Sequence, residues 1–209
     1  GSGKVNKLEY AKFLAASMAY LVLKQRDSVG LSIFDSEVRT YMPPRSAMGI
    51  IVEIDKMLRE IVPTPKTTVA KQLHDIALMM KRRSFVILIS DLLADVEDIM
   101  AGLDHLRFDG HNVVVLHTLD PYELEFPFKG TWRFEGLERE LPLTTQPERI
   151  RDDYMANIGR YLKALSSGCV GANIDYKTVD ISRPLDGVLN EFFAERATTL
   201  NGGAVGART

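Results

Sequence analysis

The sequence predicts a three-layer, doubly wound α/β fold around a mostly parallel sheet. Two segments support this prediction, residues 84–91 (SFVILISD) and 111–117 (HNVVVLH). Uninterrupted apolar runs of this length are typical of strands that are buried on both faces. A helical segment separates them, and a strand–helix–strand order is typical of a sheet with helices on both sides. We assign residues 1–196 to this domain and expect residues 197–209, rich in Gly, Thr and Ala, to be a disordered tail.

The N-terminal segment predicts a helix followed by a hairpin. Asn6 can cap a helix over residues 6–25, whose apolar side chains fall on more than one face and therefore need cover on several sides. Two β-rich runs follow, residues 29–35 and 37–42, and we expect them to pair as a hairpin. Pro43 and its neighbouring proline should end the second strand.

Three helices are expected in the middle of the chain. Ser46 can cap the first, which should run to about residue 62 with one buried apolar stripe. The second follows a loop at 63–68 and should end near Lys81. Asp95 begins the third, which leads into the strand at 111–117.

Residues 120–145 interrupt this rhythm and predict an irregular excursion with a short hairpin, 132–134 against 140–143. The aromatic residues there fit two interpretations equally, a small core under the excursion or an exposed surface for a partner. This aromatic group consists of Phe126, Phe128, Trp132 and Phe134.

The last third predicts a helix, a strand and a helix. The sequence Thr145-Gln-Pro-Glu148 has the spacing of a capping box with proline in the first turn, and should begin a helix that ends near Ser166. Residues 174–179 should form a strand and 184–196 a final helix.

Composition excludes several classes of function. A net charge of −2 argues against a nucleic-acid binder, and Lys81-Arg82-Arg83 is expected to interact with the dipole of the helix that it ends. The single cysteine, Cys169, permits no internal disulfide and is expected to be buried and structural. The most apolar stretch, residues 13–23, is too short to cross a bilayer, so we expect no membrane segment and a cytoplasmic protein.

Three aspartates follow apolar strands and are therefore candidate site residues: Asp35, Asp91 and Asp120. Ligands of open parallel sheets bind beyond the carboxyl ends of the strands, where these side chains should gather. Carboxylate oxygens suit hard cations such as Mg²⁺. The alternative is that each aspartate caps the turn or helix that follows it.

Five segments of the chain combine into a specific pattern. Three lie in its first quarter: KLEYA from Lys7, DSVGLSIFD ending at Asp35, and PPR ending at Arg45. The other two are RRSFVILISDLL around Asp91 and HTLDPYELEFPF from His117. Together these motifs resemble the DUF58 family, whose domain is similar to von Willebrand factor A domains. The resemblance covers residues 7–196.

The resemblance implies a metal-ion-dependent adhesion site for Mg²⁺ or Mn²⁺. Such a site needs Asp-x-Ser-x-Ser after the first strand, a Thr on a second loop and an Asp on a third; Thr67 and Asp91 match the last two. The first element, expected before Lys7, is absent, and Thr68 stands where the family commonly has Asp. We therefore expect weak metal binding or none. We also expect the first strand of the fold to be missing, which would leave a gap where a homodimer could form.

We thus expect a non-enzymatic protein-interaction module, with Asp35, Thr68 and Asp120 as candidate partner-binding residues. Relatives are commonly encoded beside MoxR-type AAA+ ATPases, so the resemblance implies such a partner. The alternative is a metal-assisted hydrolase or transferase on a Rossmann-like sheet, with Asp91 as nucleophile or metal anchor and Asp35 or Asp120 assisting.

Overall fold

A three-stranded parallel sheet forms the centre of the fold. In the computed structural model, which describes residues 5–62, 69–134 and 143–203, the sheet has the order β3-β4-β7. The strands are β3 (Phe85–Ser90), β4 (Asn112–Leu119) and β7 (Asp175–Asp180). Every residue of β4 after the first is buried, which explains the continuous apolar run in the sequence.

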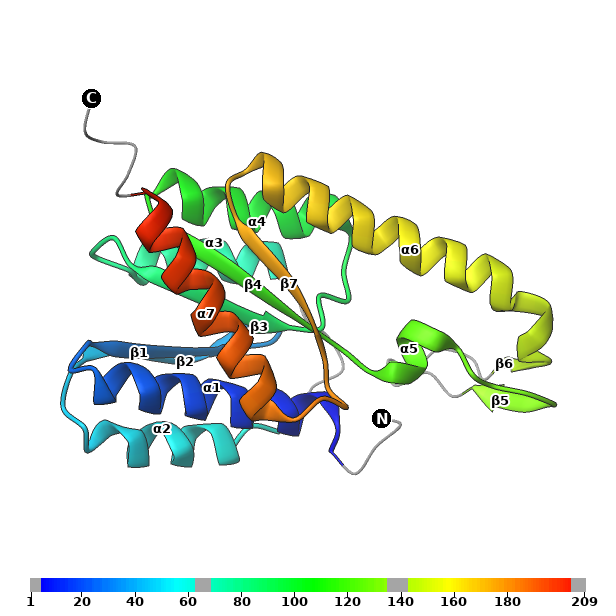
Figure 1. Ribbon diagram of the computed structural model, residues 1–209, viewed down its shortest axis with the longest axis horizontal. Coiled ribbons are helices and arrows are strands. Elements are labelled where there is room, and N and C mark those ends of the chain that lie inside the picture. The colour runs from blue at the N-terminus through cyan, green and yellow to red at the C-terminus, as the bar shows by residue number, and fades with distance from the viewer. Residues whose placement is uncertain (1–4, 63–68, 135–142, 204–209) are drawn as a thin grey trace.

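Helices cover both faces of this sheet, so the three-layer α/β prediction is confirmed (Figure 1). α3 (Val69–Met79), α4 (Val96–Phe108) and α6 (Pro147–Gly171) lie on one face. α1 (Lys7–Lys24) and α7 (Leu185–Gly203) lie on the other. A separate apolar core fills each interface.

The two cores divide the inward side chains of the sheet between them. Alternate residues of β4 point to opposite faces. Val115 therefore packs with α4 and α6, and Leu116 packs with α1 and α7. Cys169 of α6 is fully buried in the first core, and burial raises its thiol pKa to about 11.

The β1–β2 hairpin and α2 (Ile50–Arg59) form a third core with α1. β1 (Val29–Phe34) pairs antiparallel with β2 (Val38–Arg45). Among the described residues, no strand ladder joins this hairpin to β3, which is an edge of the parallel sheet.

The expectation that Pro43 ends β2 is wrong, because the strand continues and Arg45 pairs with Val29. The pairing is irregular between Val29 and Leu31, opposite the two prolines. A proline lacks the N–H of a regular ladder, and a bulge accommodates this. Gly30 permits the close approach, because a Cβ there would lie 2.8 Å from the Met42 carbonyl oxygen.

Several helix boundaries differ from the sequence prediction. α2 begins after Gly49, with no side-chain cap, and Ser46 lies in the preceding segment. Thr145 does not cap α6; the N-cap is Gln146, without a side-chain bond. α7 continues to Gly203, so part of the expected tail is helical.

The capping-box prediction at α6 failed because its glutamate has another partner. Glu148 accepts a hydrogen bond from the Gly130 backbone N–H at 2.7 Å. Thr145 belongs instead to β6 (Leu143–Thr145), which pairs with β5 (Trp132–Phe134). The hairpin was expected with residues 140–143, most of which lie outside the described residues.

α5 (Pro121–Glu125), the β5–β6 hairpin and the N-terminal half of α6 project from one side of the sheet (Figure 1). Aromatic rings pack inside this projection. Phe126 is buried and stacks on Tyr154 at 4.4 Å, and Phe128 meets Phe126 and Trp132 edge to face. Trp132 keeps 43% exposure, so Phe126, Phe128 and Trp132 form a small core with an exposed rim. The side chain of Phe134 lies outside the described part of the chain.

Within the residues described, none of the helices has both the length and the apolar character needed to span a membrane.

Candidate functional site

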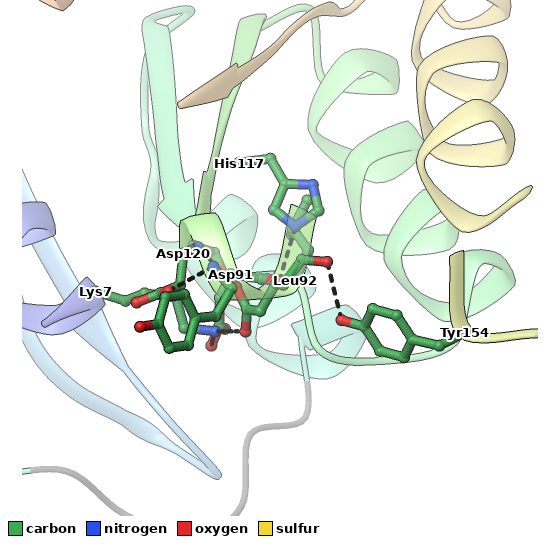
Figure 2. A network of polar contacts seen from close by, with 9 residues as sticks. Lys7, Asp91, Leu92, His117, Asp120 and Tyr154 are labelled. Carbon is green, nitrogen blue, oxygen red and sulfur yellow. Dashed lines mark hydrogen bonds and ion pairs between the residues drawn. The ribbon is translucent and has the colours of Figure 1, made fainter. Parts of the chain in front are cut away.

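The carboxyl end of the parallel sheet holds a network of charged and polar side chains that come from several helices, strands and loops (Figure 2). Asp91 follows the last residue of β3, and Asp120 follows the last residue of β4. Because the two strands are parallel neighbours, their ends meet at the same edge. The network is therefore where ligands of open α/β sheets bind.

Lys7, in the first turn of α1, bridges two acidic residues of this edge. Its Nζ lies 3.1 Å from Asp91 Oδ2 and 2.6 Å from Glu123 Oε1. Burial lowers the pKa of Lys7, but the carboxylates of Asp91 and Glu123 raise it further, so the net shift is upward. The ammonium therefore lies beside Asp91, one of the two candidate metal ligands that the family resemblance implies.

Asp120 and Glu123 form a capping box at the start of α5. The Asp120 carboxylate accepts from the Tyr122 N–H at 2.9 Å, and the Asp120 N–H donates to Glu123 at 2.8 Å. Asp120 is buried, with 4% exposure. These contacts agree with the prediction that Asp120 caps the helix that follows it. Glu123 connects this cap to Lys7 through their ion pair.

The loop after β3 is held in a strained conformation. Leu92 is fully buried and has φ 47°, in the left-handed region that costs a residue with a side chain about 1 kcal/mol. Its N–H donates to Ser90 Oγ at 3.0 Å. The Tyr161 hydroxyl of α6 binds the carbonyl oxygens of Leu92 and Ala94. These bonds fix the backbone that positions Asp91.

His117, buried in β4, fixes the same loop from within the sheet. Its Nε2 lies 2.9 Å from the Asp91 carbonyl oxygen, which only accepts, so Nε2 carries the proton. The Tyr176 hydroxyl then donates to Nδ1 at 2.7 Å. Burial lowers the pKa of His117, so the ring is neutral near pH 7. The strand predicted over residues 111–117 continues to Leu119, so His117 lies within β4.

The remaining candidate residues from the sequence are not part of the network at the carboxyl end of the sheet, as far as the described residues show. Asp35 lies in the β1–β2 turn, where its carboxylate binds Arg39 Nε at 2.9 Å and the Glu37 N–H at 3.1 Å. Its side chain is 13% exposed, and these contacts lie within its own hairpin. They agree with the alternative prediction that Asp35 caps the turn that follows it. Thr67 and Thr68 lie outside the described residues.

Sequence reasoning missed Lys7, Glu123 and Tyr161 as members of the network. For Glu123 a signal existed, because Asp-Pro-Tyr-Glu from Asp120 has the spacing of a capping box. Lys7 and Asp91 are far apart in the chain, and no local pattern joins them.

The described side chains fit a divalent ion poorly. Asp91 offers a carboxylate that is 41% exposed, but Lys7 already binds it. Among the residues with described positions, no group of three or more His, Cys, Asp or Glu side chains could hold a metal ion. An ion at Asp91 would have to displace the ammonium.

Comparison with known proteins agrees with this architecture. A family model described as "Protein of unknown function DUF58" matches residues 1–162. The chain belongs to the DUF58 family. This DUF58 chain is also similar to a solved structure, the conserved hypothetical protein BatB from Bacteroides thetaiotaomicron. The TM-score is 0.57 at 16% identity, covering 91% of this chain and 88% of that one, which is a likeness of fold. No curated protein matches the chain.

Proposed function

We propose that this DUF58 domain is a non-enzymatic interaction module that binds a protein partner at the carboxyl end of its sheet. The observation that supports the proposal is Asp91, a carboxylate that keeps 41% exposure on a loop fixed from two sides. A charged group held in one orientation loses little conformational entropy on binding. Fixed loops on a rigid sheet are common positions for binding residues.

The partner that the family resemblance favours is a MoxR-type AAA+ ATPase. Asp91 and Glu123 share one ammonium, so this edge keeps an excess of negative charge toward solvent. The matching partner surface would present a basic side chain, which could replace Lys7 as the cation between the carboxylates. Such recognition uses charge complementarity and requires no nucleophile or general base.

A divalent ion is a weaker part of the proposal. Mg²⁺ or Mn²⁺ could bind at Asp91, with Thr67 as the other ligand that the family pattern implies, and a partner carboxylate could complete the site. We expect weak binding or none in the isolated chain, because Lys7 competes for the Asp91 carboxylate.

Binding to the MoxR-type ATPase of the same genome, measured by calorimetry with ATP present, tests the proposal. Asp91→Asn should weaken binding at least tenfold, since it removes a charge at the centre of the contact. Asp55→Asn is a matched control, because Asp55 is a half-exposed carboxylate paired with Arg59 on α2. Equal affinity of the Asp91→Asn variant and wild type would exclude this face as the contact.

The open edge of β3 supports self-association as a second mode of binding. In the part of the chain that the structure describes, β3 pairs with β4 on one side and has no ladder on the other. An unpaired strand edge can pair with a second copy. A mass that rises toward a dimer with concentration, measured by light scattering, would agree with this mode; a monomer at all concentrations would exclude it.

A further inference from the structure

The opposite end of the sheet, where β3 and β4 begin, combines exposed apolar side chains with a basic cluster. We call it the strand-start face. Its apolar members lie at the ends of α3 and α4 and at the first residue of β3. They are Leu78 (69% exposed), Met79 (41%), Phe85 (41%) and Phe108 (88%).

The cluster Lys81-Arg82-Arg83 lies on the same face. The sequence placed it at the end of a helix, but α3 ends at Met79, so the three side chains belong to the following loop and are exposed. No ion pair is described for any of the three within residues 5–62, 69–134 and 143–203. They are concentrated in a chain whose net charge is −2.

Backbone contacts bring the basic loop beside the end of α4. The Asn112 N–H donates to the Ser84 carbonyl oxygen at 3.0 Å, and the Ser84 N–H donates to His111 Nδ1 at 3.1 Å. Arg83 reaches Gly110, where an added Cβ would lie 2.8 Å from the Arg83 Nε. Gly110 is two residues beyond Phe108, so Phe108 and the cluster are neighbours.

The ends of α3 and α4 are level at this face. The rings of His74 on α3 and His105 on α4 are in contact, with centroids 4.2 Å apart. Leu78 lies one turn beyond His74, and Phe108 lies about one turn beyond His105. The exposed apolar side chains of the two helices therefore end side by side.

We propose that the strand-start face binds the surface of an anionic phospholipid bilayer. The basic loop would contact lipid phosphates, while Phe108 and Leu78 would enter the boundary between headgroups and acyl chains. This combination of cations and protruding apolar groups is typical of peripheral membrane contacts. The proposal does not depend on the function proposed for Asp91, because the two faces lie at opposite ends of the strands.

The composition of the strand-start face favours a bilayer over a nucleic acid as its ligand. Each Lys or Arg near an anionic surface strengthens binding about fivefold, so the cluster alone gives a useful attraction. Carboxylates at the same end of the sheet oppose this attraction. They include Asp109, whose Oδ2 lies 3.6 Å from His105 Nε2, and the exposed Asp104 near the end of α4 and Asp175 at the start of β7. A nucleic acid would use the cations but leave the exposed Phe108 and Leu78 in water, whereas a bilayer buries both kinds of group.

Co-sedimentation of the full chain with vesicles tests the proposal. We expect binding to mixed phosphatidylglycerol–phosphatidylcholine vesicles that falls with added salt, and at least tenfold weaker binding to pure phosphatidylcholine. Lys81→Gln with Arg82→Gln should reduce binding roughly 20-fold, from two lost cations. Phe108→Ser should reduce it about tenfold, from lost apolar burial.

Two control variants separate the face from general charge and hydrophobicity. Lys56→Gln with Arg59→Gln removes two exposed cations of α2, and Phe13→Ser removes a ring of α1 that is 56% exposed. Both controls should bind as wild type does. No binding to the anionic vesicles, or equal losses in the controls and the strand-start variants, would overturn the proposal. Circular dichroism of each variant establishes that it is folded.

Discussion

Lys7→Met tests the central ion bridge most directly, because it removes the ammonium and keeps a flexible apolar stem. The Nζ lies within 3.1 Å of both Asp91 and Glu123, and all three side chains are partly exposed. Solvent screens such pairs, so each contributes about 0.5–1 kcal/mol after discounting. Loss of both pairs also leaves the two carboxylates facing each other. We expect the free energy of unfolding to fall by about 1–2 kcal/mol.

Urea unfolding followed by circular dichroism measures this change. Lys56→Met is the matched control, because Lys56 lies 3.9 Å from Glu60 on the exposed surface of α2. The control should lose less than about 0.5 kcal/mol. If the two variants unfold at the same urea concentration, the bridge does not stabilise the fold and the reasoning is wrong.

The same variant reports on the competition between Lys7 and a divalent ion. With the ammonium gone, Asp91 and Glu123 lose their cation, and we expect Mn²⁺ to bind more tightly by about tenfold in calorimetry. Unchanged Mn²⁺ binding would mean that Lys7 does not compete with the ion for the carboxylates. The pKa of Lys7 is raised in the folded chain, so its stabilisation is complete below about pH 10.5 and is lost as the pH rises through the folded pKa.

Three further predictions concern buried groups. Tyr161→Phe should lower the free energy of unfolding by about 1–2 kcal/mol, because the Leu92 and Ala94 carbonyl oxygens lose their donor. The control Tyr20→Phe, at a 43% exposed position, should change this free energy little. Equal urea midpoints for the two variants would contradict the prediction. Burial lowers the pKa of His117 and of His111, so the unfolded chain binds protons more readily, and stability should fall as the pH drops below about 6.5. The urea midpoint is measured about one pH unit below and about one pH unit above this value, and equal midpoints at the two pH values would refute the prediction. Cys169 should resist a thiol reagent in the native state and react in urea, because it is fully buried with a pKa raised to about 11; fast native labelling would show that α6 opens.

Much of the fold could be predicted from local patterns. The continuous apolar run of β4 indicates burial on both faces and is confirmed, whereas β3 is an edge strand in which only Leu88 is buried. Asn6 caps α1 as expected, accepting from the Glu9 N–H at 2.9 Å. The errors arose where a distant partner overrides a local signal. Gly30 accommodates the prolines of β2, and the Gly130 N–H donates to Glu148, the glutamate that was expected to cap α6.

The sequence predicted only some of the residues of the candidate site. Asp91 and Asp120 stand at the strand ends where open sheets bind ligands, so a position rule selected them. The same rule selected Asp35, whose carboxylate binds Arg39 within its own turn. A strand-end aspartate looks alike in sequence whether it faces a ligand or closes a turn, because both uses need the same short carboxylate.

The sequence by itself determined which segments become helices and strands, the parallel sheet and the family, since periodicity and motifs are local properties of the chain. Tertiary structure decided which distant groups meet. Lys7 and Glu123 are 116 positions apart, and Tyr161 reaches Leu92 across 69. Such contacts depend on how helices pack against the sheet, which local patterns leave open, and they place the Lys7 ammonium beside Asp91.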